Sequence, residues 1–215
     1  MDEQRIREEI VRIVKEEYRN GMVNMFEGNV SARLGDRFFI TPSQVAKEDM
    51  TPEMIIEIDA SGEIVSAMEG MTPSSERMMH LEVYRLRPDA TAVVHNHSVY
   101  ATAFAMNGMP IETDRLTEAN MIIGTVPLVP YGTPGTSRIY ERFSDYIGET
   151  KGLLLANHGL ITFGKSLQLA YSYAEAIEKI AQTIAVSKSL CADPDESTAI
   201  PSEELAMLRG MSQSH

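Results

Sequence analysis

The chain has 215 residues, of which 43% are hydrophobic and 23% charged, and its formal net charge is −12, with 31 acidic against 19 basic residues. These values are typical of a soluble globular protein with one large core or two small ones. The acidic balance argues against a nucleic-acid partner, because phosphate backbones bind basic patches. It is compatible with a small phosphorylated ligand, since backbone N–H groups and hydroxyls at a helix start can hold one.

Three features favour a cytoplasmic protein. No stretch approaches the roughly 18 apolar residues of a membrane span. The first five residues lack the basic and apolar regions of a signal peptide. Cys191 is the only cysteine, so no internal disulfide can form, and this suits a reducing compartment.

The first third of the chain is predicted to form one amphipathic helix and two hairpins. Apolar residues recur at helical spacing before Asn20-Gly21, and short apolar runs flank two turns that contain glycine. The predicted elements are a helix over 3–19, strands over 29–34 and 37–41, a helix start at Thr51-Pro52, and strands over 54–59 and 63–67.

The remainder alternates helices with short apolar strands. In chain order, we expect a helix over 73–86, a strand ending at 95–97, a helix over 98–106, a short strand over 126–129, a helix over 137–147, strands over 152–157 and 160–163, a long helix over 167–190 and a short helix near 203–209. This alternation predicts a single α/β layered domain, and the hairpins indicate a sheet that is at least partly antiparallel.

Three of the five histidines occupy matching places at strand ends. His95 and His97 follow the apolar run 90–94, and residues two apart on a strand point to the same face. His158 follows a second apolar run over 152–157. A single histidine of this kind is usually a packed core residue, but three together predict a metal site. Zinc is the first choice because it suits neutral imidazole ligands, although cobalt, manganese or iron would also fit.

Glu76 is the candidate for a fourth ligand or a catalytic base. It is placed by the pattern in the first turn of the helix that Pro73-Ser74-Ser75 opens, where the helix dipole favours an anion. The alternative is an ordinary solvated glutamate. His80 lies four residues further on and shares that helix face. We expect it in the core or behind the ligands rather than on the metal.

Small polar residues at three places could hold an anion. They are Gly28-Asn29 before a strand, Ser43 after Thr41-Pro42, and Ser74-Ser75 at a helix start. Each offers backbone N–H groups or hydroxyls, which are the parts of a phosphate cradle. Taken singly, each serine is equally well explained as a helix cap or turn residue.

Together these segments resemble the class II aldolase and adducin family, and within it the fuculose-phosphate aldolase branch. The matching segments keep the family's order over residues 1 to about 190. They are Gly28-Asn29-Val30-Ser31, Ile40-Thr41-Pro42-Ser43, Pro73-Ser74-Ser75-Glu76, Arg87-Pro88-Asp89-Ala90 with Ala92-Val93-Val94-His95-Asn96-His97, Val129-Pro130-Tyr131 with Pro134-Gly135-Thr136, and Asn157-His158-Gly159.

The resemblance implies an architecture and a set of partners. It implies a three-layer α/β/α domain over residues 1–190 with a central, mainly antiparallel sheet. Residues 191–215 would then form a partly mobile C-terminal tail with a short helix. It also implies a homotetramer of fourfold symmetry with active sites at subunit interfaces, and a small phosphorylated sugar as substrate.

The resemblance also implies roles for individual residues. His95, His97, His158 and Glu76 would bind one Zn²⁺ per subunit, and Glu76 would exchange protons with substrate during turnover. The substrate phosphate would be held by Gly28, Asn29, Ser43, Ser74 and Ser75.

The implied reaction is cleavage of a ketose 1-phosphate, such as L-fuculose 1-phosphate, to dihydroxyacetone phosphate and an aldehyde through a metal-stabilised enediolate. Glutamate at position 76 favours the aldolases, because the epimerase branch has aspartate there. Other reactions of the scaffold remain alternatives, namely dehydration of methylthioribulose 1-phosphate, 4-epimerisation of a pentulose phosphate and decarboxylation of an oxo-acid phosphate. A non-catalytic scaffold, as in adducin, would not need three histidines and a glutamate.

Three positions depart from the fuculose-phosphate aldolase pattern. Gln44 replaces a glycine, and Pro134 replaces an aromatic residue of the aldehyde pocket. The tyrosine that a neighbouring subunit supplies as proton donor has no counterpart between Pro110 and Pro127. Glu118 lies in that stretch and is the candidate substitute, with an exposed helix glutamate as the alternative.

Overall fold

A computed structural model describes residues 2–191 and 199–212. The expected C-terminal tail over 191–215 therefore lies partly outside the described residues. The predicted short helix is present as α6 (Ser202–Ser212). None of the described helices combines the length and apolar character that a membrane crossing needs.

One eight-stranded sheet forms the centre of the molecule, in the order β4-β3-β2-β1-β5-β8-β7-β6. Every neighbouring pair is antiparallel except β6 and β7, so the predicted mainly antiparallel sheet is confirmed. The strands are β1 (Asn29–Leu34), β2 (Arg37–Ile40), β3 (Ile56–Ile58), β4 (Ile64–Ser66), β5 (Ala92–Asn96), β6 (Leu128–Val129), β7 (Gly152–Leu155) and β8 (Gly159–Gly164).

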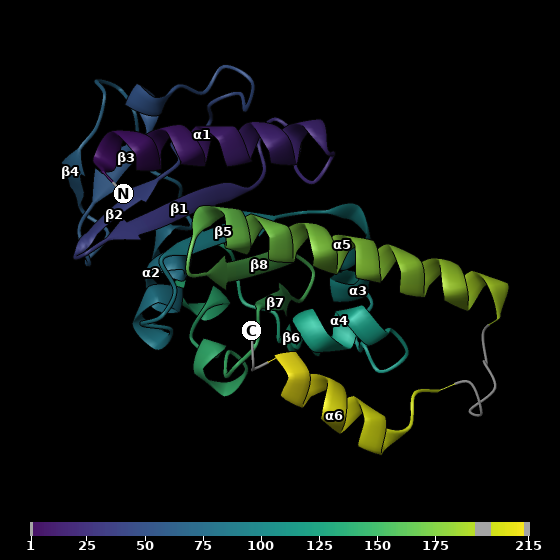
Figure 1. Cartoon of the computed structure of the whole chain (residues 1–215). Helices are drawn as coiled ribbons and strands as arrows, with labels where there is room; N and C mark the ends of the chain where they lie inside the picture. The colour runs from purple at the N-terminus through teal and green to yellow at the C-terminus, as the bar shows by residue number, and fades with distance from the viewer. Residues whose placement is uncertain (1, 192–198, 213–215) are drawn as a thin grey trace.

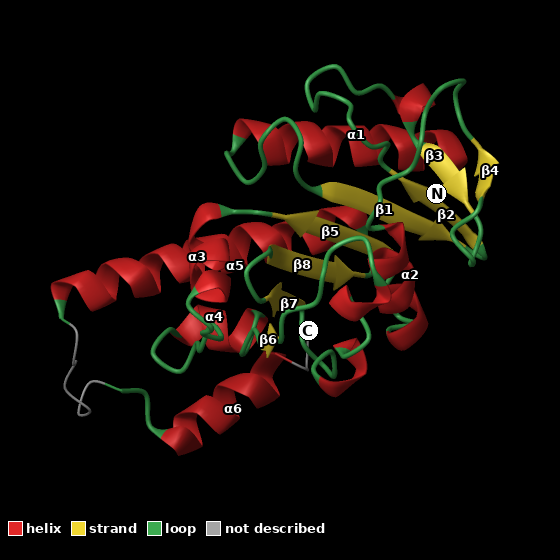
Figure 2. Ribbon diagram, turned by 180° about the vertical axis from the view of Figure 1, so that it is seen from behind, coloured by secondary structure: helices red, strands yellow, loops and turns green. Residues whose placement is uncertain are grey.

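Helices cover both faces of the sheet, which gives the predicted three layers (Figures 1 and 2). Helices α1 and α5 pack over one face, and α2 lies on the other with the short 3-10 turns η2 and η3. The helical elements are α1 (Glu3–Arg19), η1 (Pro52–Met54), α2 (Arg77–Leu86), α3 (Val99–Met106), α4 (Thr117–Ile122), η2 (Ser137–Ile139), η3 (Phe143–Asp145) and α5 (Leu167–Leu190).

Alternation along the strands separates two apolar cores. In β5, Ala92 and Val94 face the core under α1 and α5, whereas Val93 faces the core under α2. His95 follows in the same alternation and therefore points to the α2 side. The sheet thus determines which layer meets the predicted metal site.

Two predicted helices differ from the structure. The helix predicted from residue 73 begins only at Arg77, because Ser74 N–H donates to the carbonyl of Thr41 and Pro42 bridges to Pro73. The helix predicted over 137–147 is instead the two turns η2 and η3. That segment is rich in serine, aromatic and β-branched residues, which are weak helix formers, and its buried Ile139 and Phe143 pack against the sheet.

Candidate metal centre and active site

The candidate site lies where the ends of three neighbouring central strands come together. Asn29 at the start of β1 pairs with His95 near the end of β5. His95 also pairs with Ile161 on β8, so the turn between β7 and β8, which carries His158, lies beside it. The predicted strand over 152–157 ends at Leu155, and Asn157 turns the chain with a left-handed φ of 56°.

The three predicted histidines converge through the same ring atom. The Nε2 of His95 lies 3.2 Å from the Nε2 of His97 and 3.1 Å from the Nε2 of His158. Bonds of about 2.0–2.1 Å at tetrahedral angles separate two zinc ligands by about 3.3 Å. Both distances from His95 therefore match the spacing of two corners of a tetrahedral site. They form the His/Cys/Asp/Glu cluster with metal-ligand spacing among the described residues.

Interactions behind the rings keep Nε2 available. His95 Nδ1 lies 2.9 Å from the carbonyl oxygen of Leu160, to which it must donate, so its Nε2 keeps a lone pair. On the other side, the Nδ1 of His97 lies 3.6 Å from an oxygen of Glu27. Burial lowers the pKa of His95 to about 3 and also lowers the pKa of His97. Both imidazoles are neutral at neutral pH, the form that binds metal.

Close backbone approach at Gly159 makes room for the cluster. A Cβ there would lie 2.5 Å from the carbonyl oxygen of Asn96 and 2.7 Å from Cδ2 of His97. Any other residue would push the His97 ring away, so the glycine of the Asn157-His158-Gly159 segment is a geometric requirement.

Glu76 completes the cluster from the α2 side. Its Oε1 lies 2.9 Å from His158 Nε2, and its Oε2 lies 3.4 Å from His95 Nε2. It occupies the N-cap of α2 rather than the first turn, which corrects the prediction, and its side chain makes no cap hydrogen bond. That carboxylate is thereby left pointing at the histidines instead of at its own helix.

The environment of Glu76 favours the carboxylate form. Burial raises the pKa of this carboxyl, but His95, His158 and the amide of Asn29 together lower it well below its usual range. Its buried Oε1 has no hydrogen-bond partner among the described residues. Three imidazole nitrogens and one ionised oxygen fit a divalent cation, which would satisfy all four atoms.

A buried chain of hydrogen bonds supports Glu76 from behind. Asn29 Nδ2 donates to Glu76 Oε2 at 2.9 Å, which turns Asn29 Oδ1 toward Nε2 of His80 at 2.5 Å. His80 must therefore donate from Nε2 and accept at Nδ1 from Ser31, 2.7 Å away, and Ser31 also contacts the hydroxyl of Tyr84. Burial lowers the pKa of His80 to about 4, which keeps it neutral. His80 thus has the role expected of it behind the metal ligands.

One cavity of about 400 Å³ gathers the remaining predicted residues. All five phosphate-site candidates, Gly28, Asn29, Ser43, Ser74 and Ser75, line it together with Glu76, His97 and His158. His95 is fully buried behind this wall. The segments that the sequence offered as separate weak signals are therefore parts of one site.

The serine loops are already ordered. Ser43 Oγ donates to the carbonyl of Pro73, and Ser74 Oγ accepts from the backbone N–H of Glu76. Gln44 has a φ of 59°, so it takes the left-handed conformation that glycine would adopt easily. Glycine, which the fuculose-phosphate aldolase pattern has at this position, would adopt this backbone conformation with less strain.

Sequence reasoning missed two charged residues of the cavity wall, Glu27 and Lys47. Glu27 immediately precedes the Gly28-Asn29 segment, so its nearness was a readable signal. Lys47 follows Ser43 by four residues in an irregular loop, and no periodicity marks its direction.

Glu118 lies apart from this cavity. It is exposed on α4 and borders a different hollow, which α4 shares with α5 residues such as Lys179 and Ile180. The chain therefore does not bring Glu118 to its own histidines. A role in catalysis would require Glu118 from another copy, and that role stays a prediction.

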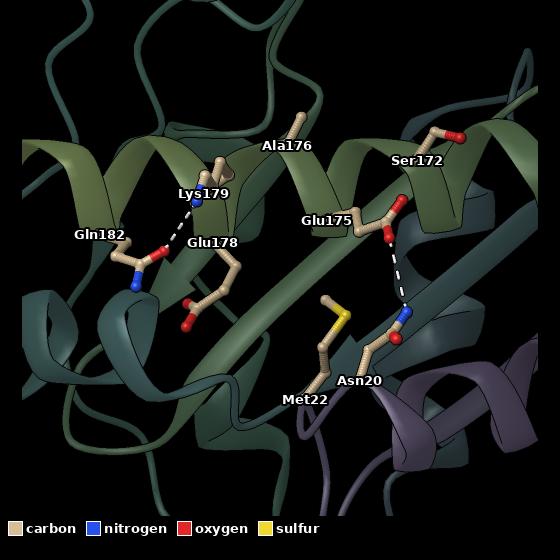
Figure 3. A pocket seen from close by; sticks show the side chains of 8 residues that line it. All are labelled: Asn20, Met22, Ser172, Glu175, Ala176, Glu178, Lys179 and Gln182. Atoms are coloured by element: carbon tan, nitrogen blue, oxygen red, sulfur yellow. Dashed lines mark hydrogen bonds between the residues drawn. The ribbon is translucent and has the colours of Figure 1, made fainter.

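A second hollow, lined by residues from the end of α1 and from α5, is larger than the metal-site cavity but lacks its chemistry (Figure 3). Asn20 donates to Glu175 there, and Lys179 pairs with Gln182 (Figure 3). Glu178 accepts from the backbone N–H groups of Tyr100 and Ala101 and so caps the start of α3. These groups hold helices together.

Comparison with known proteins places this geometry in a family. The family model described as "Class II Aldolase and Adducin N-terminal domain" matches residues 8–185. The chain belongs to the class II aldolase family.

The relatives of this chain are named for different reactions. The chain is 34% identical to an L-fuculose phosphate aldolase of Escherichia coli O6:H1 over 95% of both chains. It is also 34% identical to a 3-oxo-tetronate 4-phosphate decarboxylase of the same organism, over 85% of this chain and 87% of the relative. A solved L-fuculose 1-phosphate aldolase superposes with a TM-score of 0.87 at 25% identity, covering 97% of this chain and 96% of that one.

These likenesses support a metal-binding protein of sugar-phosphate chemistry. They agree with the histidine cluster and confirm the layered fold that was predicted. They leave the individual reaction to be argued from the site.

Proposed function

We propose that the protein is a zinc-dependent aldehyde-lyase that cleaves a ketose 1-phosphate, such as L-fuculose 1-phosphate, to dihydroxyacetone phosphate and an aldehyde. One observation carries the proposal. A single cavity presents a four-donor metal cluster, Glu76 as its acidic member, and five small or hydroxyl residues suited to a phosphate.

The metal and phosphate ends have separate tasks. His95, His97 and His158 would hold the ion, which when bound supplies a Lewis acid that stabilises negative charge on the substrate's carbonyl and hydroxyl oxygens. Ser43, Ser74 and the Gly28-Asn29 segment would anchor the phosphate and so align the scissile C–C bond with Glu76.

Glu76 would handle the proton on carbon. Cleavage breaks one C–C bond and releases the aldehyde. Glu76, displaced from the metal and in its protonated form for this step, would give its proton to the carbon left with the electron pair, which yields dihydroxyacetone phosphate. In the synthetic direction, the ionised Glu76 takes that proton back. Asn29 and His80 hold the carboxylate in place for both steps.

A second proton leaves the substrate hydroxyl that becomes the aldehyde oxygen, and it returns there in synthesis, so another group is needed. Glu118 of a neighbouring copy is proposed to accept this proton in cleavage and to donate it in synthesis, because its own chain places it away from the cavity. This proposal requires the homotetramer that the family resemblance implies, with active sites at subunit interfaces. A cytoplasmic location is proposed with it.

A second candidate is decarboxylation of an oxo-acid phosphate, favoured by the equally similar decarboxylase relative. It would use the same metal and phosphate groups, and carbon dioxide would leave in place of the aldehyde. Dehydration and 4-epimerisation are further reactions of this scaffold, but Glu76 stands where the epimerase branch carries aspartate.

A coupled assay distinguishes these reactions. The zinc-loaded protein is incubated with a panel of ketose 1-phosphates, and release of dihydroxyacetone phosphate is coupled to NADH oxidation. Oxo-acid phosphates are monitored for carbon dioxide, and methylthioribulose 1-phosphate for water loss. Release of dihydroxyacetone phosphate is expected. Its absence with every ketose, together with carbon dioxide or water loss, would overturn the aldolase proposal.

A further inference from the structure

A buried lysine forms part of the cavity wall. Lys47 is only 4% exposed, and its Nζ donates to the carbonyl oxygen of Gly28 at 2.8 Å. Burying an ammonium group is costly unless it is paired, and lysine is rarely buried otherwise. Burial lowers the pKa of Lys47, whereas the nearby Glu17 acts in the opposite direction. Because burying this charge costs free energy, we expect Lys47 to have a role other than packing.

The charge balance of the cavity indicates that role. Lys47 is the only lysine or arginine among the residues that line it, whereas Glu27 and Glu76 are both acidic. A phosphate monoester carries about −1.5 to −2 at neutral pH. A metal ion would lie at the histidine end with Glu76, so at the Gly28 end hydroxyls and amides alone would have to bind this dianion, within a chain of net charge −12. Lys47 provides a positive charge at that end of the cavity.

The surroundings of Lys47 also fix where its ammonium group stays. Its hydrogen bond among the described residues is to Gly28, the residue before Asn29 in the phosphate segment, and an ammonium group has three donors. Gly28 has no room for a side chain, because a Cβ there would lie 2.4 Å from Val23 Cγ1. Two N–H groups are therefore available for a ligand beside the segment that is expected to cradle it.

A second buried ionisable residue, Glu17, lies near Lys47. It is buried on α1 and accepts from Nδ2 of Asn96 at 3.0 Å. Asn96 lies between His95 and His97 in the sequence. Burial raises the pKa of Glu17 to about 8, despite the opposing effects of Asn96 and Lys47. A largely protonated Glu17 leaves the charge of Lys47 only partly neutralised, so that charge acts on the cavity.

We propose that Lys47 binds the phosphate group of the substrate and supplies the positive charge that compensates it. This rests on the proposed function, since it assumes a phosphorylated substrate in this cavity. The ligand class is therefore a phosphomonoester dianion, and an unphosphorylated sugar would gain nothing from Lys47.

A pair of metal-chelating ligands isolates this effect. Binding of glycolohydroxamate and of its phosphate ester to the zinc-loaded protein is measured by calorimetry. Lys47→Met should weaken binding of the phosphate ester by about 10- to 100-fold, the loss typical of a charged hydrogen bond. Binding of glycolohydroxamate itself should change less than about twofold. The matched control, Lys165→Met, replaces an exposed lysine and should change neither.

If Lys47→Met weakened the binding of both ligands equally, the proposal would be overturned. Lys47 would then have only a structural role, through its hydrogen bond to the Gly28 carbonyl. If Lys47→Met does not fold, wild-type protein labelled with ¹³C at lysine Cε gives the decision. The phosphate ester should then shift the Lys47 resonance, assigned by elimination with Lys→Arg variants at the other lysines, and an unshifted resonance would refute the proposal. Failure of the aldolase assay would leave these binding ratios intact, so the two proposals fail separately.

Discussion

The metal end and the phosphate end of the cavity are built in different ways. The metal end uses side chains at the ends of neighbouring strands, and its ligand atoms already lie 2.9–3.4 Å apart. The phosphate end uses loops around Gly28, Ser43 and Ser74, whose hydroxyls are occupied with backbone partners. A rigid sheet sets the first by register, whereas loop-to-loop contacts set the second. Substitutions at the metal end should therefore cause large losses of metal binding and activity, whereas substitutions in the loops should have smaller effects.

The largest effect is expected from His95→Ala, because it removes a fully buried ligand that lies 3.1–3.4 Å from each of the other three. Zinc affinity should fall by well over the roughly 100-fold that follows loss of a group behind a ligand, and activity should fall with it. Metal content after equilibrium dialysis measures this. Full retention of tightly bound zinc in His95→Ala would show that the metal site is elsewhere.

Glu76→Gln should separate metal binding from proton transfer. The amide oxygen can still approach the metal, so zinc loss should be smaller than in His95→Ala. Loss of the acid/base group should lower kcat by about 10²- to 10⁴-fold. Deuterium exchange into dihydroxyacetone phosphate, followed by NMR, reports that step directly. An unchanged exchange rate would assign the carbon proton to another group.

Substitutions of His80 test the hydrogen bonds that support Glu76 through Asn29. His80→Leu leaves Oδ1 of Asn29 without its donor and should lower kcat about tenfold with zinc retained, within the range for groups behind metal ligands. His80→Gln keeps an N–H near Nε2 and should recover most of the loss. No difference between these two variants would mean that the hydrogen bond to Asn29 is unimportant.

The same residue predicts a pH dependence of stability. The pKa of His80 is about 4 in the folded protein and near 6.5 when unfolded, so the unfolded state binds an extra proton between these values. The free energy of unfolding of the metal-free protein should therefore fall, by up to about 3 kcal/mol, as pH decreases from 6.5 to 4. Urea titrations should show a smaller fall in His80→Gln. Equal pH slopes in the two proteins would contradict the assignment.

The smallest effect is expected at the phosphate end. Gln44 holds a left-handed backbone without being glycine, so Gln44→Gly should stabilise the protein by about 0.5–1 kcal/mol and leave phosphate-ester binding within about twofold. Gln182→Gly, inside α5, is the matched control and should destabilise by about 1 kcal/mol. Destabilisation by Gln44→Gly would show that the Gln44 side chain has a role in the loop.

Local sequence patterns predicted the structure correctly where a regular helix or strand determines the direction of each side chain. The amphipathic period predicted α1 and α5, and the two-residue period of a strand put His95 and His97 on one side. The same reasoning was wrong for 137–147, where Ile139 and Phe143 fill the core through short 3-10 turns instead of a helix. There, packing against the sheet overrode a weak propensity.

The sequence by itself determined the sheet's strands, the layered fold and the three histidines proposed to bind metal, because apolar runs and the residues at their ends can be read within short segments. Only the tertiary structure decided what faces those histidines. It placed Glu76 at the N-cap of α2, linked it through Asn29 to the buried His80, and left Glu118 outside the cavity, beside a different hollow. It also brought Lys47 to the cavity wall, since loop contacts between distant segments have no period that a sequence can display.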